Sequence, residues 1–60
     1  MKLSELLKEF RRNKIRFKQH GKRHDFYYSP ITGKTVMVPR HAKEIPDGTL
    51  KSIKKDAGLD

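Results

Sequence analysis

The 60-residue sequence contains no cysteine and no long apolar run. Without cysteine, neither a disulfide nor a thiolate metal site can supplement the core. No apolar segment reaches the length of a signal-peptide core or a membrane span, so we expect a cytoplasmic location. Because only 33% of the residues are hydrophobic, we predict one small domain over residues 1–60 with a limited core.

Acidic residues are also scarce: seven Asp and Glu stand against fifteen Lys and Arg, which gives a net charge of +8. Such an excess attracts polyanions, and nucleic acid is the commonest of these. Lysine kept for solubility is the alternative explanation, but several cations cluster in residues 11–18 instead of alternating with acids. In a strand, these residues form a basic outer face that includes Lys18 and fits contact with an RNA backbone.

The hydrophobic period changes along the chain. One stripe has helical spacing: Leu3, Leu6, Leu7 and Phe10. From Ile15 the period becomes two, which predicts three short strands with turns at residues 21–22 and 32–34. A last helix follows Pro46, and Gly58 fits its left-handed C-cap. The α-β-β-β-α order predicts an α+β fold in which both helices cover one face of a three-stranded antiparallel sheet.

In the second predicted strand, Phe26 and Tyr28 are expected to face the core. Tyr27 then lies on the outer face, where it is placed to stack on an unpaired base; an ordinary surface aromatic is the alternative. The same alternation turns His24 toward the core side, so it reaches RNA only if it lies at the mouth of the strand, or if a bulge beside Gly21 or a strong twist changes its direction.

The segment between the first two strands, residues 20–24, places histidine among cations. Histidine is the side chain whose unperturbed pKa lets it exchange protons near neutrality. With cations on the phosphate, such a group can assist attack by a ribose 2′-hydroxyl on the adjacent phosphorus. For His24 the residues alone leave two interpretations open: a catalytic acid or base, or a half-buried histidine hydrogen-bonded to Asp25 or to the backbone.

Other residues are candidates for roles around His24. The expected contacts to phosphate and RNA come from Lys22, Arg23, Arg40, Lys18 and Tyr27. His20, expected on the basic face, and His41 are candidates for a second proton carrier, with a solvated surface histidine as the alternative for each. Zinc is not expected, because Gly21 argues against a helix here and no cysteine or carboxylate completes a ligand set.

Several features together resemble the HicA family, the small RNA-cleaving toxins of bacterial toxin–antitoxin pairs. These are the element order, the glycine-basic-histidine turn at Gly21, the strand end at residues 36–39 and the tail over residues 44–59. The most specific part is the last helix, with its proline-x-glycine-threonine start at residues 46–49 and its alanine-glycine-leucine end at residues 57–59. The resemblance covers nearly the whole chain.

The resemblance implies a fold similar to a double-stranded-RNA-binding domain and an endoribonuclease that cleaves mRNA without a metal. It also implies an acidic antitoxin partner, HicB, that silences the toxin. The family usually has glycine-serine-histidine, often followed by a second histidine. Here Lys22 stands at the serine position and Arg23 at the first histidine position, so the implied catalytic residue is His24. The alternatives are a non-catalytic RNA-binding module of the same fold and a toxin remnant that only binds the antitoxin.

Overall fold

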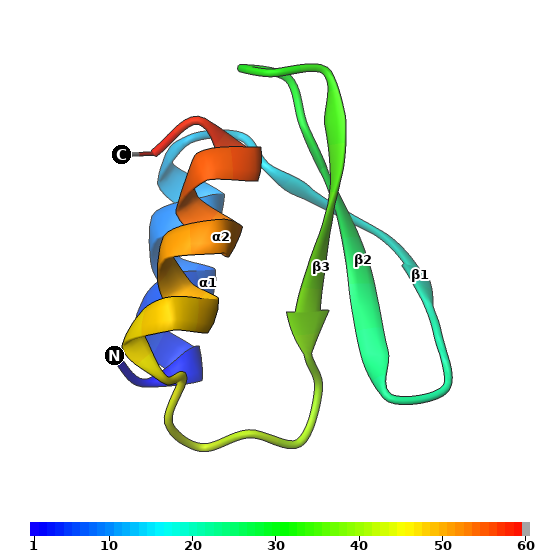
Figure 1. Cartoon of the computed structure of the whole chain (residues 1–60). Helices are drawn as coiled ribbons and strands as arrows, with labels where there is room; N and C mark the ends of the chain where they lie inside the picture. The colour runs from blue at the N-terminus through cyan, green and yellow to red at the C-terminus, as the bar shows by residue number, and fades with distance from the viewer. Residues whose placement is uncertain (60) are drawn as a thin grey trace.

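The computed structural model describes residues 1–59 and contains two helices and one sheet (Figure 1). The elements are α1 (Leu3–Arg12), β1 (Arg16–His20), β2 (His24–Ser29), β3 (Lys34–Pro39) and α2 (Asp47–Ala57). The strands form an antiparallel sheet in the order β1-β2-β3, and both helices lie on one side of it. The predicted α+β fold and element order are confirmed. In the described part of the chain, neither helix is long and apolar enough to cross a membrane.

The hydrophobic core lies between the helices and the inner face of the sheet. Its buried apolar side chains are Leu6, Phe10, Ile15, Val36, Val38, Ile45, Ile53 and Ala57. Leu6 and Phe10 therefore mark the buried side of α1, as their helical spacing predicted. Val36 and Val38 mark the buried side of β3, as their alternation predicted.

The C-terminal end of α2 is closed by hydrogen bonds from two directions. Gly58 adopts the left-handed conformation at φ 79°, and the Leu59 N–H donates to the Lys54 carbonyl at 2.9 Å, as in a Schellman motif. From the sheet, Ser29 Oγ donates to the Ala57 carbonyl at 2.6 Å. The predicted C-cap at Gly58 is confirmed, and the buried Ser29 hydroxyl has a partner, as a buried polar group needs.

Helix α1 ends in the same motif, but with a lysine at the left-handed position. Lys14 has φ 61°, and the Ile15 N–H donates to the Phe10 carbonyl at 2.9 Å. Because a Cβ is strained in this conformation, Lys14→Gly is expected to raise the free energy of unfolding by about 0.5–1 kcal/mol in urea denaturation. Lys14→Ala removes the same charge but keeps the Cβ. An equal gain in that variant would show that charge, and not backbone strain, limits stability here.

The side chains of β2 point opposite to the predicted directions. Tyr27 pairs with the buried Val36, and directly paired residues lie on the same face of a sheet. Tyr27 therefore faces the helices, where its ring packs edge-on against Phe10 with centroids 5.3 Å apart. The prediction that Phe26 and Tyr28 face the core and Tyr27 the outside is wrong: Phe26 and Tyr28 share the outer face.

A bulge in β1 changes the direction of its last residue. The register shifts between Phe17 and Gln19, which leaves Lys18 as the extra residue. Beyond the bulge, His20 pairs with Asp25, and its ring lies 4.7 Å from the ring of Phe17. His20 therefore lies on the helix side of the sheet, and the prediction that it belongs to the basic outer face is wrong.

Candidate functional site

The turn between β1 and β2 exposes the cations Lys22 and Arg23 and is held tightly at its base. The Gly21 N–H donates to the His24 carbonyl at 2.7 Å. A Cβ on Gly21 would lie 2.7 Å from the Phe26 ring and 2.8 Å from that carbonyl oxygen. Close packing therefore requires glycine here, and the glycine lets the backbone of His24 close the mouth of the hairpin.

His24, the predicted catalytic residue, is the first residue of β2 and lies on the outer face of the sheet. It pairs with Pro39 and is partly exposed. The expectation that it turns toward the core is wrong, because the other set of β2 side chains, the one that includes Tyr27, faces the helices. The imidazole therefore reaches solvent without any bulge in β2.

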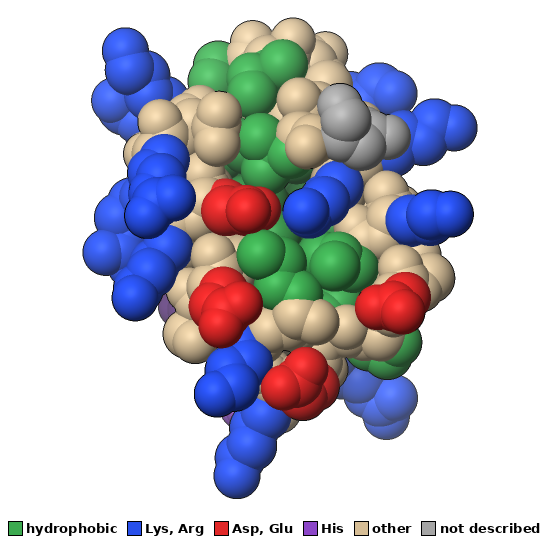
Figure 2. Space-filling model, turned by 90° about the vertical axis from the view of Figure 1, so that its left-hand side faces the viewer, with side chains coloured by type: hydrophobic (Ala, Val, Ile, Leu, Met, Phe, Trp, Pro, Cys, Tyr) green, Lys and Arg blue, Asp and Glu red, His purple; other side chains and the backbone are tan. Residues whose placement is uncertain are grey.

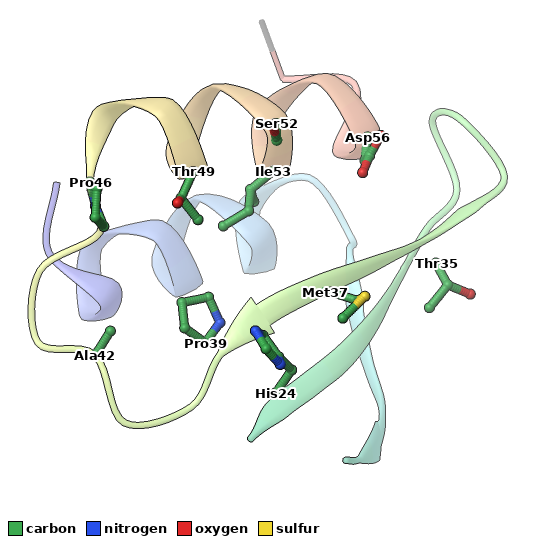
Figure 3. Close-up of a pocket in the computed structure, with 10 residues that line it drawn as sticks. All are labelled: His24, Thr35, Met37, Pro39, Ala42, Pro46, Thr49, Ser52, Ile53 and Asp56. Atoms are coloured by element: carbon green, nitrogen blue, oxygen red, sulfur yellow. The ribbon is translucent and has the colours of Figure 1, made fainter. Parts of the chain in front are cut away.

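The His24 ring lines a groove of about 450 Å³ between α2 and the free edge of β3 (Figure 3). Apolar side chains and hydroxyl groups share the lining: Met37, Pro39, Ile53, Thr35, Thr49 and Ser52. A carboxylate, Asp56, also lines the groove, from the last turns of α2 (Figure 3). The groove thus offers apolar contacts and hydrogen-bonding groups beside the imidazole.

The other histidine of the hairpin belongs to a cluster on the helix side. His20 Nδ1 lies 2.7 Å from Asp25 Oδ1, and Arg40 Nε donates to the same oxygen at 3.0 Å. The Arg40 guanidinium also donates to the Gly21 carbonyl. The hydrogen bond to His20, together with the charge of Arg40, holds the pKa of Asp25 below its ordinary value of 3.8. Because Nδ1 faces this carboxylate, Nε2 is the His20 nitrogen left for solvent or substrate.

Two of the residues that were predicted to act beside His24, Arg40 and His20, lie on the other face of the sheet. Arg40 extends to Asp25 on the helix side, so its guanidinium lies on the face opposite to His24. His20 and His24 also lie on opposite faces, so the two rings cannot share one metal ion. Within residues 1–59, no three side chains of the metal-ligating types converge. His41 is exposed in the loop after β3.

Of the two other residues predicted to contact RNA, Lys18 lies on the predicted face and Tyr27 does not. Lys18 lies on the outer face as predicted, and its Nζ donates to Thr35 Oγ1 at 3.3 Å across the sheet. Tyr27 lies against Phe10 on the helix side. Burial, with a smaller effect from the Asp25 charge, raises the pKa of the Tyr27 phenol.

The link between His20 and Asp25 can be tested by NMR titration of the carboxyl group. His20→Ala removes the main cause of the shift, so the pKa of Asp25 is expected to rise toward 3.8. Since the folded pKa is depressed, the stabilisation is fully present above pH 3.8 and is lost as the pH falls through the folded pKa. His20→Ala should weaken this acid-side loss of stability, whereas His41→Ala should leave the Asp25 titration unchanged. An unchanged Asp25 pKa in His20→Ala would contradict the cluster.

The protein is a small, strongly basic α-β-β-β-α domain that presents histidines at a cationic hairpin. A family model described as the HicA toxin of bacterial toxin–antitoxin matches residues 3–59, nearly the whole chain. The chain belongs to this HicA toxin family, and membership implies an antitoxin partner. No curated protein and no solved structure matches the chain.

Proposed function

We propose that the chain is a metal-independent endoribonuclease that cleaves mRNA, with His24 as the catalytic residue. The observation that carries the proposal is the position of His24 at the mouth of the hairpin, on the open face of the sheet and next to the exposed Lys22 and Arg23. Such a site combines a group that exchanges protons near neutrality with cations for phosphate charge. Membership of a toxin family supports an activity of this kind.

The proposed reaction transfers a phosphoryl group within the RNA. His24 removes the proton of a ribose 2′-hydroxyl, and the 2′-oxygen attacks the adjacent phosphorus. The bond from phosphorus to the 5′-oxygen breaks, and that oxygen takes a proton from a general acid. Lys22 and Arg23 offset the charge that develops on the phosphate oxygens. The products are a 2′,3′-cyclic phosphate and a free 5′-hydroxyl.

We assign the general acid to His20 in preference to His41. Asp25 fixes the His20 ring at 2.7 Å, and Arg40 holds that carboxylate in turn, which is how a proton-transferring histidine is commonly oriented. His20 is also exposed, so its Nε2 is open to solvent at the hairpin, whereas His41 lies in the loop after β3.

The antitoxin partner is proposed to be an acidic, HicB-like protein. The net charge of +8 favours such a partner through electrostatic attraction. By covering Lys22, Arg23 and His24, it would block RNA and proton transfer together.

Incubation of the purified protein with RNA in excess EDTA tests the proposal. The wild-type protein is expected to cleave the RNA, because no step uses a metal ion. Intact RNA despite measurable binding would overturn the enzyme in favour of a non-catalytic RNA-binding module. Intact RNA, no binding and a tight complex with an acidic antitoxin would indicate a toxin remnant.

A further inference from the structure

We propose that the outer face of the sheet binds unpaired RNA, with a base stacked on Tyr28 and the strand directed toward His24. The inference rests on the proposed function and deepens it, because it specifies single-stranded RNA as the substrate and places it on one surface. That surface, the outer face, consists of the side chains of β1, β2 and β3 that point away from the helices.

Aromatic rings follow one another along this face. His24, Phe26 and Tyr28 alternate with side chains that point inward, so the three rings share one side of β2. Tyr28 is 46% exposed, and Met37, paired with Phe26, is exposed as well. Both helices lie on the other side of the sheet (Figure 1), and α2 borders this face along the edge of β3, where His24 and Met37 line the groove. Such a row gives flat apolar contact surface that leads to the proposed catalytic residue.

Cations lie beside Tyr28, and the strands place no carboxylate on this face. Arg16 pairs directly with Tyr28 on one side. Thr35 pairs with Tyr28 on the other side and accepts the hydrogen bond from the Lys18 ammonium at 3.3 Å. Asp25 is the only acidic residue in the three strands, and it faces the helices. Stacking surface between cations is what binding of single-stranded nucleic acid requires.

The helix side has a different charge pattern. Figure 2 shows this side, where carboxylates lie among the Lys and Arg side chains. One such pair joins Lys54 Nζ to Glu9 Oε2 at 3.9 Å. The carboxylates reduce the attraction of the helix side for phosphate, so a polyanion is favoured on the outer face.

The rings select unpaired RNA because the bases of a duplex already stack on one another. Sheet surfaces that recognise RNA use exposed aromatics to stack bases of single strands. Tyr28 and His24 are four residues apart in one strand, a distance of about 13 Å. An RNA strand with one base stacked on Tyr28 therefore reaches His24 within a few nucleotides of that base.

Binding of a labelled, non-cleavable single-stranded RNA, with a duplex of the same sequence beside it, tests the inference. Tyr28→Ala is expected to weaken binding of the single strand roughly 5- to 150-fold, and Tyr28→Phe, which keeps the ring, should bind like the wild type. Phe17→Ala is the matched control, because Phe17 is equally exposed at 48% but lies on the helix side. Its RNA affinity should stay at the wild-type value.

Salt dependence separates stacking from charge. Lys18→Ala should reduce the slope of log K against log salt by about 0.7, the value for one phosphate contact on a single strand. Arg12→Ala, which removes an exposed cation of α1, should leave the slope unchanged.

Two outcomes would overturn the inference while leaving the proposed function intact: a wild-type preference for the duplex, or unchanged cleavage and binding in a folded Tyr28→Ala. If Tyr28→Ala binds RNA like the wild type but forms a weaker complex with the antitoxin, the outer face binds the protein partner. This result would also overturn the inference. Failure of the wild-type protein to bind any RNA would overturn the inference and the proposed function together. The Tyr28→Phe variant guards against loss of folding in the alanine variant.

Discussion

Replacing His24 with alanine is expected to reduce the single-turnover rate constant of RNA cleavage by roughly 10²- to 10⁴-fold, the range that a positioned acid or base contributes. RNA affinity should change much less, because the exposed Lys22 and Arg23 carry the charge at the hairpin. The measurement is the cleavage rate at saturating protein in excess EDTA, with the dissociation constant of a non-cleavable RNA measured in parallel. A loss of binding in proportion to the loss of cleavage would show that His24 only holds the RNA.

A substrate with sulfur in place of the leaving 5′-oxygen separates the two histidines. A thiolate leaves without a proton, because a thiol is a far stronger acid than an alcohol. The cleavage defect of His20→Ala should therefore largely disappear on the sulfur substrate, whereas the defect of His24→Ala should persist. A defect of His20→Ala that is equal on both substrates would contradict its assignment as the general acid.

Replacing Phe10 with alanine is expected to leave most of the isolated chain unfolded at room temperature. The ring is buried and packs against Tyr27 of β2, so its removal opens a cavity between α1 and the sheet. Such a truncation costs about 3–5 kcal/mol. A domain of 60 residues has a total stability of the same order, roughly 3–9 kcal/mol. Thermal and urea unfolding followed by circular dichroism measure the effect.

Phe17→Ala supplies the matched control for Phe10→Ala. Phe17 is half exposed at the edge of the sheet, so its truncation should cost less than about 1 kcal/mol. A partner that binds only the folded toxin should restore structure to Phe10→Ala by mass action. A cooperative transition at the wild-type midpoint in isolated Phe10→Ala would contradict the position of α1 in the core.

The order of elements could be predicted because the hydrophobic periods are unambiguous where they matter. Leu6 and Phe10 lie one helical turn apart, and the two β-branched residues Val36 and Val38 alternate in the third strand. Gly58 marked the end of α2, since its left-handed conformation suits glycine. Each of these signals is local, so the sequence around it was sufficient.

The face of β2 could not be predicted from β2 itself, because aromatic residues occur on both sides of it. Phe26 and Tyr28 form the more apolar set, yet Tyr27 is the ring that meets Phe10. Ser29 lies on the buried side because its hydroxyl donates to the carbonyl of Ala57 at the end of α2, which is 28 positions away in the sequence. The pairing with β3 decides the question, and no single-strand pattern contains it.

The candidate site was predicted in part. The hairpin and its cations could be recognised from residues 20–24, but the cluster on the helix side depends on the bulge at Lys18, which turns His20 toward Asp25. Arg40 reaches His20 and Asp25 only because β3 runs beside β2. At the end of β3 the backbone N–H of Arg40 donates to the Arg23 carbonyl at 3.2 Å. The bulge has no signal in residue spacing, and the predicted turn at residues 32–34 brings β3 back beside β2 without indicating that Arg40 meets Asp25.

The chemical identity of the RNA ends distinguishes histidine-assisted attack by the 2′-hydroxyl from other routes of cleavage. After cleavage by the wild-type protein in excess EDTA, we predict a 2′,3′-cyclic phosphate on one fragment and a 5′-hydroxyl on the other. An RNA with a single 2′-deoxyribose at the cleavage position should stay intact there. Fragments that carry a 5′-phosphate, or cleavage that continues at the deoxyribose, would rule out attack by the 2′-hydroxyl.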